Sequence, residues 1–261
     1  MAVLDTALAV VPPIATHHHS EWELGDLVAA KGRSRVVVCI PARDEVRTIG
    51  AIVSCIRRRL LEGVGLVDEI LVVDDGSGDG TAAEALRHGA DVVAGPGLGK
   101  GEAMGAAKGR GDYVVYLDGD VENFAAHYVS GLLGPLLCGS GRVMVKGSYR
   151  RPLGDHPTGG GRVTELVAKP MISLLFPELV GVHQPLAGET ALQANVLDEI
   201  ELTGGYGVEM GLLLDVWRHF GVDAIAQVDL GERRHRNRPL SELGPQARDV
   251  IAAALARAPL A

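Results

Sequence analysis

The stretch at residues 113–120 (YVVYLDGD) constrains the fold and the function of this chain more than any other. Its first five residues are apolar and include two β-branched valines, which is typical of a short buried strand. The carboxylates of Asp118 and Asp120 follow the strand directly, where they repel each other and are poorly solvated. A divalent cation would remove that cost, because Mg²⁺ and Mn²⁺ prefer oxygen ligands. The alternative interpretation is a solvated turn, in which Asp and Gly are common.

Strand-like and helix-like segments alternate through the first half of the chain. Strands are predicted at residues 35–40, 69–73, 91–94 and 113–117, and helices at 48–61, 81–88 and from the glycine-rich stretch to 108. Such alternation predicts an α/β fold with a parallel sheet and right-handed crossovers. Ligands of these sheets bind at the carboxyl ends of the strands.

Three of the predicted strands end in polar clusters, at residues 41–45, 74–77 and 118–120. Because parallel strands end at the same edge of a sheet, we expect the three clusters to meet there. This convergence indicates a binding site more strongly than any one cluster does. Glu45, Ser77 and the pair Asp74-Asp75 are expected to form a nucleoside pocket.

The glycine-rich stretch at residues 95–101 (GPGLGKG) matches neither of the common phosphate-binding motifs. A Walker loop needs Ser or Thr after the lysine, and a dinucleotide fingerprint needs a third glycine where Glu102 stands. Two interpretations therefore remain: a loop that brings Lys100 to a phosphate, and a plain connecting loop.

The second half of the chain has a different pattern. Helices are predicted at residues 123–137, from 159–165 to about 175, from 204–209 to 219, and at 241–257, with strands at 143–149 and 224–230. Residues 183–189 are predicted to form a loop. Residues 1–32 are interpreted as an N-terminal arm with a short helix at 23–31, because Pro12-Pro13 interrupts regular structure.

Composition and charge exclude some classes of function. The net charge of −8 and the aromatic content of 4% argue against a nucleic-acid-binding surface. The three cysteines, Cys39, Cys55 and Cys138, form no disulfide or zinc pattern, which favours a reducing cytoplasm. No apolar run approaches the length of a membrane span, and the N-terminus lacks the pattern of a signal peptide.

Basic residues are concentrated in the second half of this acidic protein. An acidic protein repels an anionic substrate unless positive charge is concentrated locally, and arginine suits phosphate and carboxylate because its planar fork makes paired hydrogen bonds. We therefore expect a small anionic acceptor, bound by residues of this set: Lys146, Arg150, Arg151, Arg162, Arg233, Arg234, Arg236 and Arg238. Three glycines precede Arg162 at a predicted helix start and leave backbone N–H groups for an anion.

Several of these motifs together carry a resemblance to a known family. Residues 41–45, 73–77 and 118–120 resemble the nucleotide-sugar half of glycosyltransferases with the GT-A fold. The blocks at 149–153, 159–165, 184–189, 205–209 and 235–240 resemble the glucosyl-3-phosphoglycerate synthases of actinobacteria, and the similarity runs from Trp22 to Ala256. The resemblance implies one GT-A domain at residues 33–261, with a nucleotide-sugar half at 33–120 and an acceptor half at 121–261.

The resemblance also implies roles for individual residues. Donor-binding positions of the family match Pro41, Glu45, Ser77 and Lys100, and the metal positions match Asp118, Asp120 and His235. Acceptor-binding positions match Gly161, Arg162 and Thr164. Glu209 matches a carboxylate that holds hydroxyls of the donor sugar, and Arg233 and Asn237 match further active-site positions. The chain departs from the family pattern at Asp75, where the family often has Ser, and at Arg43-Asp44.

The implied reaction is a metal-dependent transfer of glucose with retention of configuration. The expected donor is UDP-glucose, with GDP-glucose as its competitor, and the expected acceptor is 3-phosphoglycerate or, in a paralogue, another small phosphorylated or carboxylated compound. An inverting enzyme would need a carboxylate base, for which Glu209 is the candidate. A homodimer is implied by the resemblance. The alternatives are a nucleotidyltransferase and a non-catalytic sugar-nucleotide-binding protein.

Overall fold

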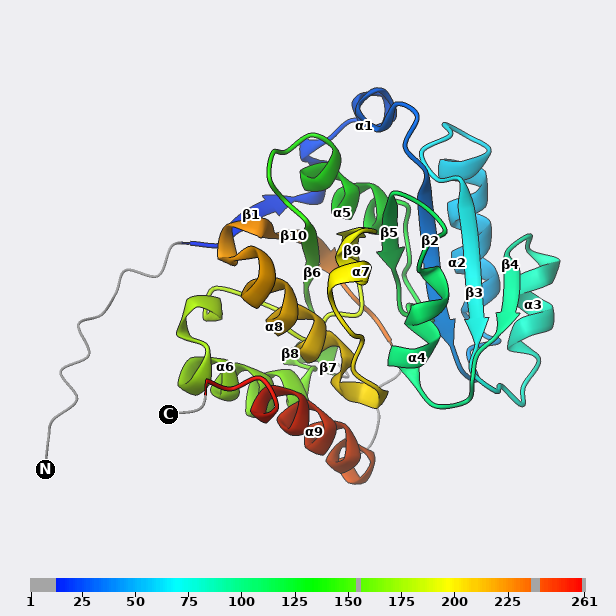
Figure 1. Cartoon of the computed structure of the whole chain (residues 1–261). Helices are drawn as coiled ribbons and strands as arrows, with labels where there is room; N and C mark the ends of the chain where they lie inside the picture. Colours follow the sequence, from blue (N-terminus) through cyan, green and yellow to red (C-terminus); the bar gives the residue numbers. More distant parts are fainter. Residues whose placement is uncertain (1–12, 154–155, 236–239, 260–261) are drawn as a thin grey trace, which may run out of the picture.

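The protein is built on one mixed sheet of eight strands with helices on both faces (Figure 1). The structure is a computed structural model and describes residues 13–153, 156–235 and 240–259. The sheet order is β1-β10-β6-β9-β5-β2-β3-β4. Its strands are β1 (Ala15–His18), β2 (Val36–Ala42), β3 (Glu69–Asp74), β4 (Asp91–Ala94), β5 (Tyr113–Tyr116), β6 (Met144–Arg150), β9 (Thr190–Gln193) and β10 (Ile225–Glu232). β7 (Pro152–Leu153) and β8 (His156–Gly159) form a separate hairpin.

The strands of the first half pair as the sequence predicts. β2 is parallel to both β3 and β5, and β4 is parallel to β3, which confirms the α/β fold class. Along β2, Val36, Val38 and Ile40 face one hydrophobic core, whereas Val37 and Cys39 face the other. Burial on both faces explains why this strand is a continuous apolar run.

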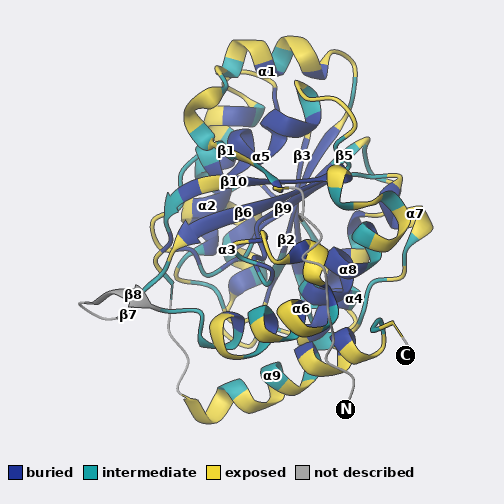
Figure 2. Ribbon diagram, turned by 90° about the vertical axis from the view of Figure 1, so that its left-hand side faces the viewer, coloured by how far each residue is buried: buried dark blue, intermediate teal, exposed yellow. Residues whose placement is uncertain are grey.

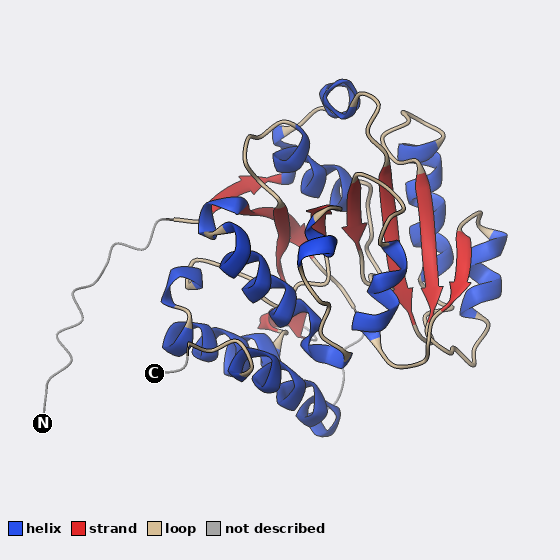
Figure 3. Ribbon diagram, in the orientation of Figure 1, coloured by secondary structure: helices blue, strands red, loops and turns tan. Residues whose placement is uncertain are grey.

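Each face of the sheet is covered by its own set of helices (Figures 2 and 3). One core is closed by α1 (Leu24–Lys31), α2 (Ile49–Ile56, continued by the turn Arg57–Leu61), α3 (Thr81–Arg87) and α5 (His127–Leu137). The other is closed by α4 (Lys100–Met104), α6 (Lys169–Leu175), α8 (Val208–Phe220) and α9 (Leu240–Leu255), with the short α7 (Val196–Glu199) nearby. Within the described residues, no helix is both long and apolar enough to span a membrane.

Two strands of the sheet were not predicted. β9 follows the predicted loop at 183–189 and lies antiparallel between β5 and β6; its sequence (TALQ) has no adjacent β-branched residues. β1 lies in the region interpreted as an arm, yet it pairs in parallel with β10, so that Ala15 is opposite Ala226.

The helix predicted from residue 123 begins later, at His127. Asn123 is engaged elsewhere: its amide donates to the Glu232 carbonyl at 2.7 Å, and its side-chain oxygen accepts from the Arg234 N–H at 2.8 Å. These contacts hold the segment after Asp120 against the segment after β10. Residues from both halves of the chain are therefore brought together at the carboxyl ends of β2, β3 and β5.

Candidate active site

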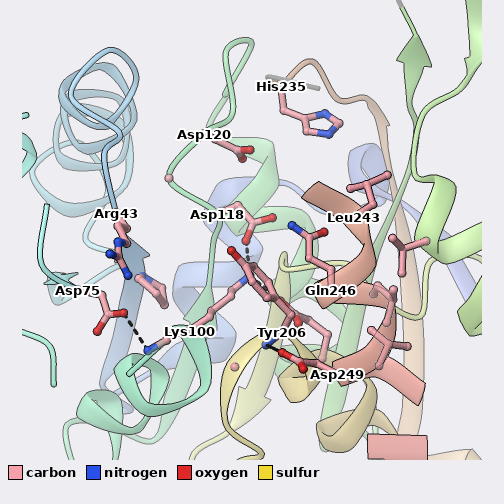
Figure 4. A pocket seen from close by; sticks show the side chains of 18 of the residues that line it. Arg43, Asp75, Lys100, Asp118, Asp120, Tyr206, His235, Leu243, Gln246 and Asp249 are labelled. Atoms are coloured by element: carbon pink, nitrogen blue, oxygen red, sulfur yellow. Dashed lines mark hydrogen bonds and ion pairs between the residues drawn. The ribbon is translucent and has the colours of Figure 1, made fainter. Parts of the chain in front are cut away.

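A pocket of about 770 Å³ opens at the carboxyl ends of the parallel strands (Figure 4). Its walls come from the loop after β2, the glycine-rich loop, the turn after β5, the start of α8 and the helix α9. The polar clusters predicted to meet at this edge do meet there: Glu45, Asp75, Asp118 and Asp120 all line the pocket.

Most residues predicted to form a site line this pocket: Pro41, Glu45, Lys100, Asp118, Asp120, Gly161, Arg162, Thr164, Glu209, Arg233 and His235. Asp74, Ser77 and Arg150 are not among the lining residues, and neither are Lys146 and Arg234 of the basic set. Asn237, together with Arg236 and Arg238 of the basic run, lies outside the described residues.

A half-buried lysine links two carboxylates at the floor of the pocket. Lys100 contacts Asp118 Oδ1, and its Nζ lies 2.6 Å from Glu209 Oε1. Burial alone would lower the pKa of Lys100, but the two carboxylates outweigh burial and raise it. Lys100 comes from the first residue of α4 and Glu209 from the first turn of α8, so this contact joins the two halves of the chain.

Arg233 is the second cation of the site. Its side chain is 2% exposed, and Nη2 donates to Asp118 Oδ2 and Asp120 Oδ1, each at 2.7 Å. Its Nε lies 3.0 Å from Glu189 Oε1 in an ion pair that lacks the angle of a hydrogen bond. Burial would lower the pKa of Arg233, but the surrounding carboxylates raise it. The carboxylates predicted to bind a metal are thus neutralised by protein cations in this structure.

The donor atoms at this end of the pocket fit a hard divalent cation. Asp118 and Asp120 supply oxygens, and burial together with Arg233 lowers the pKa of His235 to about 4, which leaves a neutral imidazole able to bind a metal. In Figure 4, the Asp120 carboxylate is directed toward the side of the pocket that carries His235. Within the described residues, no three acidic, histidine or cysteine side chains already surround a cation position. Arg233 occupies one oxygen of each carboxylate here, Asp118 Oδ2 and Asp120 Oδ1.

The glycine-rich loop is anchored by Asp75, a role that the sequence did not reveal. Asp75 is buried, and its two oxygens accept the N–H groups of Gly97 at 2.8 Å and Gly99 at 2.9 Å. Gly99 precedes α4, so Asp75 fixes the helix that begins with Lys100. Asp74, by contrast, accepts from the Ser77 N–H at 3.3 Å and shapes the turn after β3. The one available signal was the departure from the family pattern at position 75.

At the other end of the pocket the structure uses Arg151 instead of Arg150. Tyr149 is buried and Arg150 is exposed, so the alternation of a strand directs Arg151 back toward the pocket. Its guanidinium lies 4.9 Å from the centre of the Tyr149 ring. No period along β6 distinguishes the two arginines in the sequence, because its first six residues are all buried. Thr164 is buried beside Gly161, whose φ of 72° favours glycine.

The helix α9 closes the remaining side of the pocket. Leu243, Gln246 and Asp249 point into it in Figure 4. Asp249 Oδ2 accepts weakly from the Tyr206 N–H at 3.4 Å, which connects α9 to the turn before α8. The sequence indicated an amphipathic helix here, but no motif identified it as a pocket wall.

The sequence matches the model of glycosyl transferase family 2 over residues 37–137. It is 46% identical to the glucosyl-3-phosphoglycerate synthase of Mycobacterium tuberculosis over 268 aligned positions, which cover 96% of this chain and 82% of that protein. The glucosyl-3-phosphoglycerate synthase of Petrotoga mobilis is 39% identical, with 92% and 79% covered. The matched family model spans the strand ends that form one side of the pocket.

The structure is also similar to crystal structures of the Mycobacterium tuberculosis enzyme. One, in complex with Mn²⁺, UDP-glucose and phosphoglyceric acid, has a TM-score of 0.86 at 45% identity and covers 94% of this chain and 87% of that chain. Another, in complex with Mg²⁺ and UDP, has a TM-score of 0.85 at 44% identity, with 94% and 86% covered.

Proposed function

This chain belongs to the glucosyl-3-phosphoglycerate synthases, and we propose that its pocket transfers glucose from UDP-glucose to 3-phosphoglycerate. The observation that carries the proposal is that one pocket is lined both by the candidate metal ligands, Asp118, Asp120 and His235, and by Arg162, which follows three glycines. Its volume of about 770 Å³ lies within the range of small-molecule sites. The similarity extends over both walls of the pocket, because the alignment with the Mycobacterium tuberculosis enzyme covers 96% of the chain.

The donor binds, in this proposal, at the side formed by the first half of the chain. Pro41 and Glu45 would contact the nucleoside, and the loop held by Asp75 would lie against the diphosphate. Lys100 is the cation of that loop and is already fixed between Asp118 and Glu209. Asp74 and Ser77 would act indirectly, by shaping the turn after β3.

Asp118, Asp120 and His235 would hold a divalent cation, which solved relatives contain as Mn²⁺ or Mg²⁺. Such a cation would stabilise the negative charge that develops on the departing diphosphate. Arg233 would add positive charge on the same side. The family resemblance implies that Asn237, which lies outside the described residues, is a further active-site residue.

The acceptor anion would bind at the side formed by the second half. The backbone around Gly161, the guanidinium of Arg162 and the hydroxyl of Thr164 meet there, and Arg151 lies next to them. Retention of configuration is also part of this proposal. Glu209 pairs with Lys100 on the donor side, where it would hold sugar hydroxyls and not deprotonate the acceptor.

Three broader features complete the proposal. The donor and acceptor halves divide near residue 120, where the pocket separates them. A homodimer is proposed, supported by Leu166 and Leu174, which are 73% and 78% exposed on the segment that ends in α6; light scattering should then give the mass of two chains. The free thiols Cys39, Cys55 and Cys138 support a cytoplasmic location.

The test is a product assay with purified protein, 3-phosphoglycerate and Mn²⁺. We expect glucosyl-3-phosphoglycerate to form from UDP-glucose faster than from GDP-glucose, and chelation with EDTA to stop the reaction. Readdition of Mn²⁺ or Mg²⁺ should restore it. Equal activity with and without EDTA would exclude the metal, and no product from either donor would exclude the proposed transfer.

A further inference from the structure

We propose that Glu189 is a positioning residue for both ends of the pocket, holding Arg233 directly and Arg151 through the hydroxyl of Tyr149. The proposal rests on the proposed function, because it assigns Arg233 to the donor side and Arg151 to the acceptor side. Glu189 does not line the pocket, and no motif in the sequence indicates such a role for it.

Glu189 is completely buried, with 0% of its side chain exposed. Its backbone is fixed between two strands, because its carbonyl accepts the Gly147 N–H of β6 at 2.7 Å. A buried carboxylate is costly unless it is paired. The pairs that Glu189 makes are therefore strong constraints on its neighbours: its Oε1 lies 3.0 Å from Arg233 Nε, and its Oε2 accepts from Tyr149.

The Tyr149 hydroxyl transmits this constraint to Arg151. Burial raises the pKa of Tyr149, so the phenol stays protonated. Its O–H donates a hydrogen bond to Glu189 Oε2 at 2.6 Å. The oxygen has a lone pair left, and it accepts from Arg151 Nη2 at 2.8 Å. The direction of both hydrogen bonds follows from this protonation state.

Arg151 lies next to Gly160 and Gly161, which precede the proposed acceptor-binding residue Arg162. A methyl group placed on Gly161 would come within 3.3 Å of Arg151 Nη1, and one on Gly160 within 2.7 Å of Arg151 Cβ. The guanidinium is also held against the Tyr149 ring. The series of hydrogen bonds from Glu189 through Tyr149 therefore ends at Arg151, next to Gly161.

Both arginines approach the same aromatic ring, with Arg233 at 5.5 Å and Arg151 at 4.9 Å from its centre. Two guanidinium groups that approach one ring repel each other, and a carboxylate bonded to their contacts offsets that repulsion. Glu189 supplies that negative charge through its ion pair with Arg233 and the hydrogen bond that it accepts from Tyr149. It therefore sets the positions of Arg233 and Arg151 relative to each other.

The deciding variant is Tyr149→Phe, which cuts the path to Arg151 and leaves the Glu189–Arg233 pair intact. We expect the KM for 3-phosphoglycerate, and its Kd in calorimetry, to rise about tenfold, the size of one lost hydrogen bond to a charged group. The KM for UDP-glucose should change less than twofold. Tyr128→Phe is the matched control, because Tyr128 is equally buried but donates to the Glu232 carbonyl, outside the pocket.

A double-mutant cycle separates positioning from general packing. Arg151→Met should itself raise the acceptor KM, and Tyr149→Phe should then add nothing further if the tyrosine acts through Arg151. Glu189→Gln keeps the shape of the side chain but removes its charge, so it should raise the KM for both substrates. Additive effects in the cycle, or an unchanged acceptor KM in Tyr149→Phe, would overturn the proposal even if Glu189→Gln does not fold.

The outcome is distinct from a failure of the proposed function. If the wild-type protein forms no glucosyl-3-phosphoglycerate, the proposed function itself is wrong. The positioning role of Glu189, which rests on that function, is then wrong as well. If the wild type is active and Tyr149→Phe behaves like Tyr128→Phe, the function stands and the positioning role is wrong.

Discussion

Arg233 is held in place by carboxylates from two separate segments of the chain. Asp118 and Asp120 follow β5, and Glu189 precedes β9. Removing one partner of a buried ion pair costs several kcal/mol, because the other charge is left unpaired. The residues of the pocket floor are therefore expected to be interdependent.

Arg162 tests the proposed acceptor side of the pocket. Arg162→Ala removes a guanidinium from the acceptor wall, and losing one charge-assisted contact should cost about 1.5–3 kcal/mol of acceptor binding. Steady-state kinetics should show a strongly raised KM for 3-phosphoglycerate and nearly unchanged hydrolysis of UDP-glucose. Arg150→Ala, at the exposed neighbour of the pocket, is the control and should match the wild type. A normal acceptor KM in Arg162→Ala would contradict an anionic acceptor at this wall.

Residue identities were easier to predict than residue contacts. Asp118, Asp120 and His235 were predicted to hold a metal and do line one pocket, but their pairing with Arg233 depends on the packing of distant segments. Asp75 was expected at the pocket, but its hydrogen bonds to the N–H groups of Gly97 and Gly99 could not be predicted, because the glycine-rich loop matches no known motif. Such contacts follow from backbone positions that no side-chain motif records.

At the scale of elements, α4 is packed so closely that glycine is required. A methyl group on Gly101 would lie 2.0 Å from the Thr203 carbonyl oxygen, so the first turn of α4 touches the backbone before α8. This close approach places Lys100 beside Glu209. The apolar runs of β2 and β3 and the amphipathic helix α8 were predicted within a few residues. β9 (TALQ) and β1 (ATHH) were not, because they lack the adjacent β-branched residues that mark the equally short β4 and β5.

Gly101→Ala tests this packing directly. The added methyl should push α4 away from Thr203, with a loss of about 1–3 kcal/mol in the free energy of unfolding, as expected for overpacking. The KM for UDP-glucose should rise as Lys100 shifts. Thermal denaturation and kinetics measure the two effects.

Gly105→Ala is the matched control for that substitution. Gly105 follows the same helix with a φ of −59°, and a methyl there meets nothing within 4 Å. Alanine should be neutral or stabilise the protein by up to about 1 kcal/mol. Equal stability of the two variants would show that α4 has room to move.

At the scale of the whole molecule, the chain closes on itself through β1. This edge strand pairs with β10 of the second half, and the following segment packs on α5, where Trp22 lies against Gly134. The N-terminal segment thus stabilises the half that carries the acceptor wall, although it lies at the opposite edge of the sheet from β4. His18, His19 and His127 take part in this contact, so we expect it to be sensitive to pH.

His19 and His127 form the centre of this contact, with ring centres 4.0 Å apart. Burial lowers the pKa of both, and the neighbouring histidine ring adds to the effect on His19, while Asp229 opposes it. His18 lies 4.3 Å from His19 and acts in the same direction on both. His127 also donates to the Leu230 carbonyl at 3.1 Å, which favours the proton on that nitrogen.

We therefore expect the protein to lose stability as the pH falls below about 6.5, the pKa of an unperturbed histidine. Below that pH the histidines of the unfolded chain bind protons, whereas His19 and His127 in the folded protein stay neutral because their pKa is lowered. The free energy of unfolding therefore decreases as the pH falls. The double variant His19→Asn, His127→Gln should show a smaller drop in Tm between pH 7.5 and 5.5 than the wild type. His219→Gln, on the exposed end of α8, should keep the wild-type drop. His235 titrates in the same direction but is present in every variant, so it cancels in the comparison. A double variant with the full wild-type drop would show that the contact between β1 and α5 does not carry the pH dependence.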